Sequence, residues 1–510
     1  MTRQLSTDDK RLITFTWKEL SALNQRHNAH IAYKGNVYDV SSFIAKHPGG
    51  AEQLLYGAGK DITHVFDSYH SPKAFEVMRQ YLVGKLSDSE FETFETESEF
   101  YSTLKEKVST YFKANRIDPK TDPWMFLRMV IFYLLALLCW GLMIAFHSWI
   151  LLATLLALSW GFFSAMVAMS INHDAGHFAI THKPWVWKWA AAIAECLIGT
   201  STHIWIYQHT FGHHTYPNVD GADPDVSVHK DKPDIWRIVI SQKWANRYLY
   251  QHIYMPCLYC LLGIKMRLQD FHSLFIGIKG TVRLNPPTNS QLAVFFVAKV
   301  VHCVIRFVIP SFYLSIGYLL YLNLVYDLIY GFWLAIITQL NHISDTVVAP
   351  GAGTSHQWAE MQLAATMDYA TDSWFWTVFS GALNHQIAHH FFPGVLQSHY
   401  SKITPIIKQT CAEYGLQYRY AVYHCSKFAA EINLSVGLEA FKTMVRSTTN
   451  VLTHLSGVIR GSGYIKLVVS ITLKQATNQS LKRNGLLKDN DIVRVLNMLI
   501  QRKVKATQRY

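Results

Sequence analysis

Two pairs of long apolar segments constrain the fold of this chain more than any other feature. Residues 129–146 and 149–170 contain no charged side chain, and each is long enough to cross the hydrocarbon core of a membrane, which is about 30 Å thick. The second pair, 292–313 and 318–340, is similarly apolar but carries three ionisable side chains. The sequence therefore predicts two helical hairpins that together cross a membrane four times.

The ionisable side chains of the second pair are Lys299, Arg306 and Asp327. Such groups at membrane depth usually face the interior of the helix bundle and find partners there. Counted from the turn near Ser315, Arg306 and Asp327 lie about 14 and 18 Å along their helices at 1.5 Å per residue. We therefore expect these two side chains to form an ion pair.

Each predicted pair of crossings returns the chain to the side of the membrane on which it began. The polar segments after each pair are therefore expected on the same side as the N-terminus. The N-terminus is polar and predicts no cleaved signal peptide, so we expect it in the cytosol. Two crossings return the chain there before residue 173, and two more return it before residue 345. The shorter apolar stretches 186–206 and 249–264 contain charged residues or proline, which favours interfacial or partly inserted helices over further crossings.

The net charge of +12 does not indicate a nucleic-acid-binding protein. Residues 451–510 hold eleven Lys and Arg against two Asp, and the rest of the chain is nearly neutral. We predict that 431–510 form a basic extension of unknown role, whose charge suits anionic lipid. The seven cysteines are scattered and odd in number, which favours reduced thiols; a redox or metal role for the pair Cys257 and Cys260 is the alternative.

Residues 13–86 predict a small haem-binding domain. His47 stands in an HPGG turn, with Pro48, Gly49 and Gly50 allowing close backbone approach, and His70 follows downstream. Two histidines on facing helices can take both axial positions of a haem iron, which leaves the group able only to transfer electrons. The segment closely resembles cytochrome b5 in its length and in five further positions: Trp17, Tyr38, Asp39, Phe43 and Phe66. We interpret His64 as a surface residue.

An acidic segment follows the haem-binding domain. Residues 87–100 contain six acids and no basic residue, and we interpret 87–124 as a linker and connecting segment. A solvated spacer is the favoured interpretation of the acidic run, and a docking patch for a basic redox partner is the alternative.

Three histidine clusters return to the same membrane face. His173 and His177 are spaced i, i+4 and so share one side of a helix. The second cluster has the form HxxxHH and the third has the form QxxHH, and one more histidine ends the fourth apolar segment. The members of these later groups are His209, His213 and His214; Gln386, His389 and His390; and His342.

The number of imidazoles predicts a centre with two metal ions. Imidazole suits zinc, copper, iron and nickel alike, but seven or eight ligands are too many for one tetrahedral ion. Zinc has no redox chemistry, so an electron-carrying haem in the same chain selects iron. Asp223 and Asp225, in "ADPD", could hydrogen-bond ligand histidines or cap their loop.

The order HxxxH, HxxxHH, QxxHH behind a cytochrome b5 domain resembles the front-end fatty acid desaturases. The likeness covers about residues 13–425, including "HDAGH", "QHTFGHHTYPNVDGADPD", "WAEMQLAATMDYATDS" and "LNHQIAHHFFPG". Glutamine at 386, in place of the first histidine of the third box, marks the front-end group. "RLQD", "RLNP" and the QIAHH form are most similar to fungal and amoebal delta-5 acyl desaturases. Delta-6 and sphingolipid delta-8 enzymes share the boxes.

By that resemblance, the catalytic iron ligands are expected to be His173, His177, His209, His213, His214, His389 and His390, with His342 as an eighth ligand and Gln386 at a ligand position. His385 also forms an HxxxHH pattern with the third box, and we expect it to lie behind the ligands. The fold expected is an α+β cytochrome b5-like domain, then an all-α integral membrane domain over 125–430 with a cytosolic histidine-rich cap. The cofactors implied are haem b, held by His47 and His70, and two non-haem irons.

The reaction implied is O2-dependent insertion of a cis double bond between the carboxyl end and an existing double bond of a fatty acyl lipid or acyl-CoA. NADH-cytochrome b5 reductase is the implied electron source, the endoplasmic reticulum membrane is the implied location, and no nucleic acid is involved. A hydroxylase with the same irons is one rival. A membrane-anchored b5 electron carrier with inert histidines is a rival of another class.

Overall fold

The computed structural model describes residues 12–91, 93–95, 98–225, 234–238, 242–344, 347 and 357–421. All residues whose structure is described belong to a single compact unit. The predicted basic extension 431–510 and Cys425 lie outside the residues whose structure is described.

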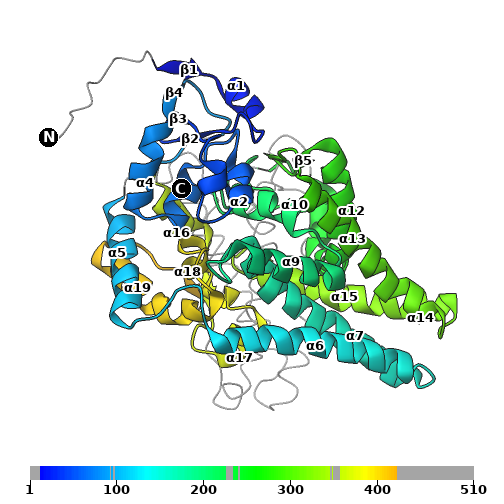
Figure 1. The fold of residues 1–510 in the computed structure, drawn as a ribbon. Helices are drawn as coiled ribbons and strands as arrows, with labels where there is room; N and C mark the ends of the chain where they lie inside the picture. Colours follow the sequence, from blue (N-terminus) through cyan, green and yellow to red (C-terminus); the bar gives the residue numbers. More distant parts are fainter. Residues whose placement is uncertain are drawn as a thin grey trace, which may run out of the picture. The chain divides into compact units, whose positions relative to one another are not determined.

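The N-terminal part is an α+β fold built on one small sheet, with strand order β1-β4-β3-β2 (Figure 1). Strand β1 pairs with β4 in parallel, and the other neighbours are antiparallel. Helices from the middle of the segment enclose a core of Ile31, Tyr38, Ile44 and Phe66, which confirms the predicted cytochrome b5-like fold class. The elements are β1 (Ile13–Phe15), α1 (Trp17–Ala22), β2 (His30–Tyr33), β3 (Asn36–Asp39), η1 (Ile44–Lys46), α2 (Ala51–Gly57), α3 (Thr63–Tyr69), α4 (Pro72–Met78), η2 (Arg79–Tyr81) and β4 (Leu82–Leu86).

Four helices among the described residues are long and apolar enough to cross a membrane. They confirm the two predicted hairpins, in which α6 precedes α7 and α13 precedes α15. Two of the four crossings run through π-helical turns, so each of these two is made of several segments. The segments are α6 (Pro123–Ala145); α7 (Ile150–Val167), η3 (Ala168–Asn172) and α8 (His173–Gly176); α13 (Asn289–Cys303), η6 (Val304–Val308) and α14 (Ile309–Ser311); and α15 (Ile316–Leu340).

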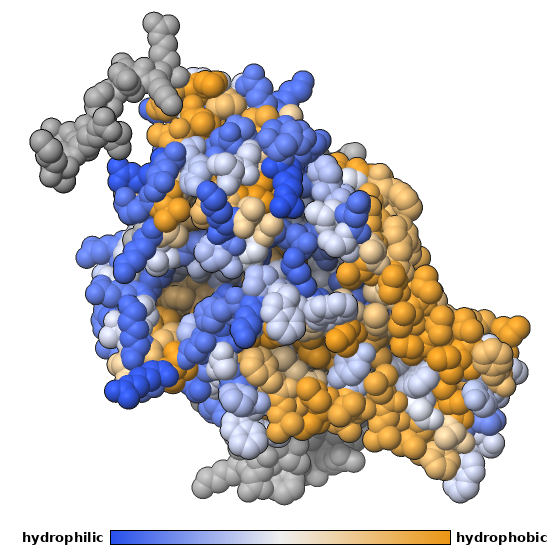
Figure 2. Space-filling model, viewed as in Figure 1, coloured by the Kyte–Doolittle hydropathy of each residue, from blue (hydrophilic) through white to orange (hydrophobic). Residues whose placement is uncertain are grey.

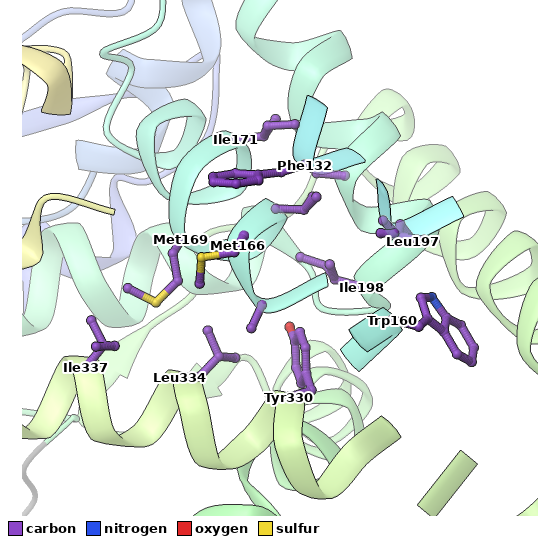
Figure 3. Packing of buried hydrophobic residues seen from close by; sticks show 14 of the residues in the cluster. Phe132, Trp160, Met166, Met169, Ile171, Leu197, Ile198, Tyr330, Leu334 and Ile337 are labelled. Atoms are coloured by element: carbon purple, nitrogen blue, oxygen red, sulfur yellow. The ribbon is translucent and has the colours of Figure 1, made fainter. Parts of the chain in front are cut away.

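Small residues bring α7 and α15 close together. Ala153, Ala157 and Gly161 recur every fourth position on α7 and are buried or lack a side chain. A Cβ at Gly161 would lie 2.5 Å from the carbonyl oxygen of Tyr326 on α15, so only glycine permits this approach. Large side chains such as Trp160, Met166 and Tyr330 fill the space on either side (Figure 3).

The predicted ion pair in the second hairpin is present. Arg306 Nη1 lies 2.8 Å from Asp327 Oδ1, and both side chains are buried. Arg267, from a helix outside the crossings, also contacts Asp327 at 2.6 Å. The single carboxylate is therefore shared by two guanidinium groups, and the second one was not predicted.

The remaining elements are mostly helices that lie outside the four crossings. Of the predicted interfacial stretches, 186–206 divides into α9 and α10, and 249–264 divides into α11 and the start of α12; none is among the candidate crossings. These elements are α5 (Glu99–Ala114), α9 (Pro184–Ile198), α10 (Thr202–Ile206), η4 (Tyr207–His213), η5 (Asn246–Tyr250), α11 (Gln251–Cys260), α12 (Leu262–Ile276), β5 (Ile278–Lys279), β6 (Val282–Arg283), α16 (Trp358–Ala365), β7 (Asp368–Tyr369), α17 (Trp374–Phe379), η7 (Leu383–His385), α18 (Gln386–Phe391), η8 (Gln397–His399), α19 (Tyr400–Glu413) and β8 (Tyr420–Ala421).

Apolar side chains cover the surface of the crossing helices, whereas the N-terminal part is mostly hydrophilic (Figure 2). Leu134 and Leu151 in the first hairpin, and Val300 and Phe312 in the second, are all more than half exposed. Exposed apolar surface of this extent marks a membrane or protein contact. On helices of this length it is the surface expected to face lipid.

Two interpretations need correction, one for a residue of the haem-binding domain and one for the acidic run that follows it. His64 is buried rather than on the surface, because its ring stacks on Trp358 of α16 with centroids 5.2 Å apart. The acidic run is not simply a solvated spacer, because Phe94 is buried close to Tyr216. Its described acids, such as Glu90 and Glu95, remain exposed. The run therefore packs through its aromatic residues and presents its acids to solvent.

Candidate metal centre and haem pocket

Local helix distortions position the first two histidine clusters. The π-helical turn η3 immediately precedes His173, and His209 and His213 lie in the π-helix η4. In η4 the His214 amide donates to the His209 carbonyl, an i, i+5 bond of 2.9 Å. This wider turn brings positions i+4 and i+5 to the same side as position i. Such π-helical turns are frequent at functional sites.

Four imidazoles from three distant segments form the first cluster. Candidate ligand atoms of His173, His177, His209 and His389 all lie within 4.8 Å of one another. His214 reaches the same space, because its Nε2 lies 2.9 Å from His389 Nε2 and 3.2 Å from His209 Nε2. All five residues are buried, so the first cluster has enough nitrogen donors to hold one ion.

A second cluster lies beside the first and includes His342, the histidine at the end of α15. Candidate ligand atoms of His213, His342 and His390 lie within 4.8 Å of one another. Gln386 Nε2 lies 2.9 Å from His342 Nε2, and its Oε1 accepts from Asn341. The structure therefore brings together all eight predicted histidines, with Gln386 at the edge of the second cluster.

Hydrogen bonds at Nδ1 fix the tautomers of several rings. His213 Nδ1 faces the Asp223 carboxylate at 3.0 Å, and His342 Nδ1 faces the Ala365 carbonyl oxygen at 3.0 Å. Because neither partner can donate, both rings carry their proton on Nδ1. Their Nε2 atoms lie 3.2 Å apart, close enough for both to contact one cation. The donor set fits a metal ion.

Burial keeps most of these imidazoles neutral, as metal ligands must be. Desolvation holds the pKa of His177, His389 and His390 well below its usual range, and nearby histidines lower it further. Burial also lowers the pKa of His209 to about 4, although the Asp225 carboxylate opposes it. At neutral pH these rings offer lone pairs rather than positive charge.

Both aspartates of "ADPD" contact histidines of the clusters, and one of them also caps the loop. His209 Nδ1 lies 3.1 Å from Asp225, and His213 Nδ1 lies 3.0 Å from Asp223. Asp223 also accepts from the backbone amides of Asn218 and Asp225. Asp223 therefore both orients a histidine and caps the loop, whereas the described contacts of the Asp225 carboxylate are with the side chains of His209 and Gln208.

Several residues that hold the rings were not found from the sequence. Asp174 lies inside "HDAGH" and bonds His173 Nδ1 at 3.0 Å. Gln362 accepts from His390 Nδ1 at 2.8 Å through Oε1, while its Nε2 donates to the His214 carbonyl. Gln362 stands in the motif "WAEMQLAATMDYATDS", which pointed to the segment but not to this role.

Two tyrosines also hold ligand rings, and neither was anticipated. The Tyr400 hydroxyl lies 3.1 Å from His389 Nδ1. The Tyr69 hydroxyl, from the haem-binding domain, lies 3.0 Å from His177 Nδ1. No local motif marks either residue, because each reaches its histidine across the fold.

His385 does not belong to either cluster. Its Nδ1 lies 2.8 Å from the Thr404 hydroxyl, and its Nε2 lies 3.4 Å from the Thr377 hydroxyl. Burial lowers its pKa to about 3. This neutral, hydrogen-bonded ring supports the expectation that His385 lies behind the ligands.

The two predicted haem ligands face each other across a cavity. The ring centroids of His47 and His70 are 6.1 Å apart. His47 Nδ1 bonds the Gly50 carbonyl at 2.9 Å, and His70 Nδ1 bonds the Phe66 carbonyl at 3.3 Å, so each ring is left with Nε2 as a ligand atom. Metal–imidazole bonds are about 2 Å long, which places two such rings about 6 Å apart around one ion. The pair fits an iron with two axial histidines.

The haem cavity has a volume of about 480 Å³ and is lined by both parts of the chain. Phe43 and Phe66 come from the N-terminal domain, and Phe178 and Trp187 come from the segments around α9. Gly50 has φ of 104°, and a Cβ there would lie 3.2 Å from Pro184. Glycine is therefore required at this turn both by the backbone and by the contact with the second part.

Polar contacts hold the two parts together near the cavity. Asn285 donates to the carbonyl oxygens of Leu55 and Ala58 and accepts from Lys60 Nζ at 2.8 Å. Burial lowers the pKa of Lys60 to about 7, although Glu90 opposes it. The Tyr56 hydroxyl also lies 3.0 Å from His203 Nδ1. The haem-binding domain is thus docked on the histidine-bearing part.

Comparison with known proteins identifies both parts. The cytochrome b5-like haem/steroid binding domain family matches residues 16–87, and the fatty acid desaturase family matches residues 148–422. An acyl-lipid (8-3)-desaturase of Mortierella alpina is 40% identical over 416 residues, which cover 79% of this chain and 92% of that protein. The chain belongs to the fatty acid desaturase family.

Two further relatives of this desaturase are proteins of Dictyostelium discoideum. Acyl-lipid (8-3)-desaturase B is 34% identical over 440 residues, covering 83% of this chain and 94% of that protein. Delta(5) fatty acid desaturase A is 35% identical over 415 residues, covering 79% of this chain and 89% of that protein. The desaturase is therefore an oxidoreductase of lipid metabolism. It is a membrane protein whose cytochrome b5-like domain implies a haem.

Proposed function

We propose that this desaturase inserts a cis double bond between the carboxyl end and an existing double bond of an acyl lipid, most specifically at the delta-5 position. The observation that carries the proposal is the joining of eight buried imidazoles from distant segments into two adjacent clusters. The three relatives named above, two called (8-3)-desaturases and one a delta(5) desaturase, support the position.

The two clusters would hold two irons. His173, His177, His209 and His389, with His214, would hold one, and His213, His342 and His390 would hold the other. Gln386 would orient His342 through its amide rather than act as a strong ligand. Bound irons would supply O2 activation and the removal of two hydrogens from an unactivated carbon chain, which acid–base chemistry alone cannot achieve.

The protein's own residues would prepare the centre for this chemistry. Asp174, Asp225 and Asp223 keep the proton of each bonded histidine on Nδ1, which leaves Nε2 free to bind metal. Such orienting partners commonly change metal affinity or activity by about 10–100-fold when removed. Burial of the rings, each less than 10% exposed, limits the access of bulk water to the reacting centre.

The docked cytochrome b5-like domain would deliver electrons from NADH-cytochrome b5 reductase. Tyr69 precedes the haem ligand His70 in sequence and bonds His177, so one short segment contacts both sites. We further propose the endoplasmic reticulum as the location, with the N-terminus and the histidine clusters in the cytosol. The single-sided gathering of all three clusters supports that orientation.

Heterologous expression tests the reaction. Yeast expressing the chain would be fed dihomo-gamma-linolenic acid and shorter polyenoic acids, and the new double bond would be located by mass spectrometry. We expect a delta-5 product that is absent with the His213→Ala variant. A delta-6 product, or a delta-8 double bond in long-chain bases, would reassign the position, and a hydroxylated product would reassign the reaction.

Metal analysis separates the enzyme from a passive electron carrier. The purified chain should contain about two irons besides the haem iron. Haem without other iron, together with no new double bond, would favour the membrane-anchored electron carrier.

A further inference from the structure

A cavity of about 430 Å³ is lined partly by His173, His209 and His389 of the histidine clusters. Apolar side chains form another part of its lining, and polar and basic side chains form a further part. The apolar lining includes Met169, Leu262, Met266 and Leu334, and the polar lining includes Gln208, Lys265, Gln269, His272 and Lys279. A ligand with an apolar chain and an anionic end fits this lining.

Lys279 is the unusual member of the polar lining. It is 5% exposed, and its ammonium lies 3.3 Å from Gln269 Oε1. Within the described part of the chain, no carboxylate lies within 4 Å of this ammonium. Burial lowers the pKa of Lys279, while Asp270 and Asp225 oppose the shift from farther away. A buried ammonium with one neutral partner is costly unless an anion joins it.

Helix α12, which contributes to the lining of the cavity, has exposed apolar side chains. Leu268 and Phe275 on α12 are 67% and 77% exposed, and apolar residues cover this region of the surface (Figure 2). Lys265 and His272 on the same helix are exposed and also line the cavity. A helix with exposed apolar and basic side chains suits the boundary between acyl chains and headgroups.

The position of Lys279 relative to the metal centre restricts the ligand. Lys279 lies beside the loop that contacts the centre, because a Cβ on the next residue, Gly280, would lie 2.5 Å from Pro224, and Asp225, which follows Pro224, bonds the candidate ligand His209. The anionic end of a bound lipid would therefore lie near the metals. In a glycerophospholipid only a few bonds separate the phosphate from the acyl carbonyl, whereas the pantetheine arm of CoA separates them widely. The short separation favours the phospholipid.

We propose that Lys279, with the exposed Lys265 and His272, binds the phosphate of a glycerophospholipid whose acyl chain lies against the apolar part of the lining. This inference rests on the proposed function, because it identifies the lipid that the same centre acts on. Because the phosphate would be held near the metals, the distance along the acyl chain from its carboxyl end would determine which carbon atoms reach the metals. Gln269 positions the Lys279 ammonium by accepting from it.

Binding measured without reductant tests the site independently of turnover. The full-length protein, purified in detergent, would be titrated with three probes that carry the dihomo-gamma-linolenoyl chain: a lysophosphatidylcholine, the CoA thioester and the methyl ester. Lys279→Met should weaken lysophosphatidylcholine binding about tenfold or more, as expected for a lost charge-assisted bond. It should change methyl ester binding less than about twofold.

Two further variants and a matched control accompany the titration. Lys279→Arg should retain binding, and Lys243→Met removes an exposed lysine outside the cavity and should have no effect. Gln269→Glu should weaken binding as Lys279→Met does, because the new carboxylate would pair with Lys279 without creating a void. Haem absorbance and iron content would verify folding of each variant.

Three outcomes would overturn the proposal. Unchanged lysophosphatidylcholine binding in both Lys279→Met and Gln269→Glu would exclude the phosphate site. Equal loss of methyl ester binding would indicate a collapsed cavity, and a loss confined to the CoA thioester would identify CoA as the carrier. Double-bond formation by the wild type is scored separately, so a protein that binds the lipid but forms no double bond contradicts only the proposed function.

Discussion

The hydroxyl of Tyr69 lies 3.0 Å from Nδ1 of His177, and Tyr69 is the residue directly before His70. One end of this segment therefore borders the haem cavity, and the other holds a ring of the metal centre. Gly394, next to the third histidine box, makes room for the Tyr69 ring, since a Cβ there would lie 2.9 Å from it.

Replacing Tyr69 with phenylalanine should impair transfer from the haem without removing the haem. The variant loses the bond to His177 while keeping the ring, and we expect desaturation to fall about tenfold, as for other lost partners of metal ligands. Stopped-flow spectroscopy would follow reoxidation of the reduced haem in the presence of O2 and substrate. Tyr81→Phe, in the wall of the haem cavity, is the matched control. Equal reoxidation rates in both variants would refute this role.

His342 and His385 should respond differently to the same substitution. His342→Gln removes a nitrogen from the second cluster, so bound iron and activity should fall at least about tenfold. His385→Gln changes a ring that bonds only threonine hydroxyls, so both should be retained. Iron would be measured by mass spectrometry of the purified variants, with haem absorbance as the folding control. Iron loss in His385→Gln alone would reverse the assignment.

Asp327→Asn should strongly destabilise the membrane part. The change leaves Arg306 and Arg267 in a buried site without their shared carboxylate. Breaking a buried pair in this way costs about 3–5 kcal/mol. Thermal unfolding in detergent would show the effect as a large decrease in the unfolding temperature. Adding Arg306→Met to Asp327→Asn should recover part of the loss, and a further decrease would contradict the shared-carboxylate account.

His64 should make the docked state sensitive to acid. Burial lowers its pKa to about 3, whereas an unfolded histidine titrates near about 6.5. Between these values the unfolded state binds one more proton than the folded state, so stability falls as the pH decreases from about 6.5 toward 3. His64→Phe keeps an aromatic ring against Trp358 and removes this contribution.

The pH dependence of the two proteins isolates that contribution. The free energy of unfolding, from denaturant titrations followed by haem absorbance, should decrease less steeply with acid in His64→Phe. The difference should approach about 1.4 kcal/mol per pH unit below pH 6. Identical slopes would mean that docking does not lower the pKa of His64.

Local patterns made much of the fold and site predictable. The length of the apolar segments was enough to predict the four crossings. The spacing of residues along a helix predicted that His173 and His177 share one side, and that Arg306 and Asp327 lie at similar depths in the membrane. The wider turn of η4 could not be predicted, because a π-helical bond has no strong local signal. Even so, the histidines of the HxxxHH pattern are among those that the structure brings together.

Contacts between distant segments could not be predicted from the sequence. Tyr69, Gln362 and Tyr400 reach their histidines only because separate elements pack together. His64 was misassigned because it looks like a surface residue of an isolated haem domain, and only the docked second part buries it. The contact of Arg267 with Asp327 was not predicted either, because Arg267 comes from a helix outside the crossings.

The haem cavity is lined by residues from both parts of the chain, and this affects the kinetics of electron transfer. Because Phe178 and Trp187 from the second part line the same cavity as Phe43 and Phe66, the electron donor and acceptor are already neighbours before any collision. Electron delivery within the chain should then be first order and insensitive to dilution of the enzyme in the bilayer. Added free cytochrome b5 would gain little access, because a tethered partner has a far higher local concentration.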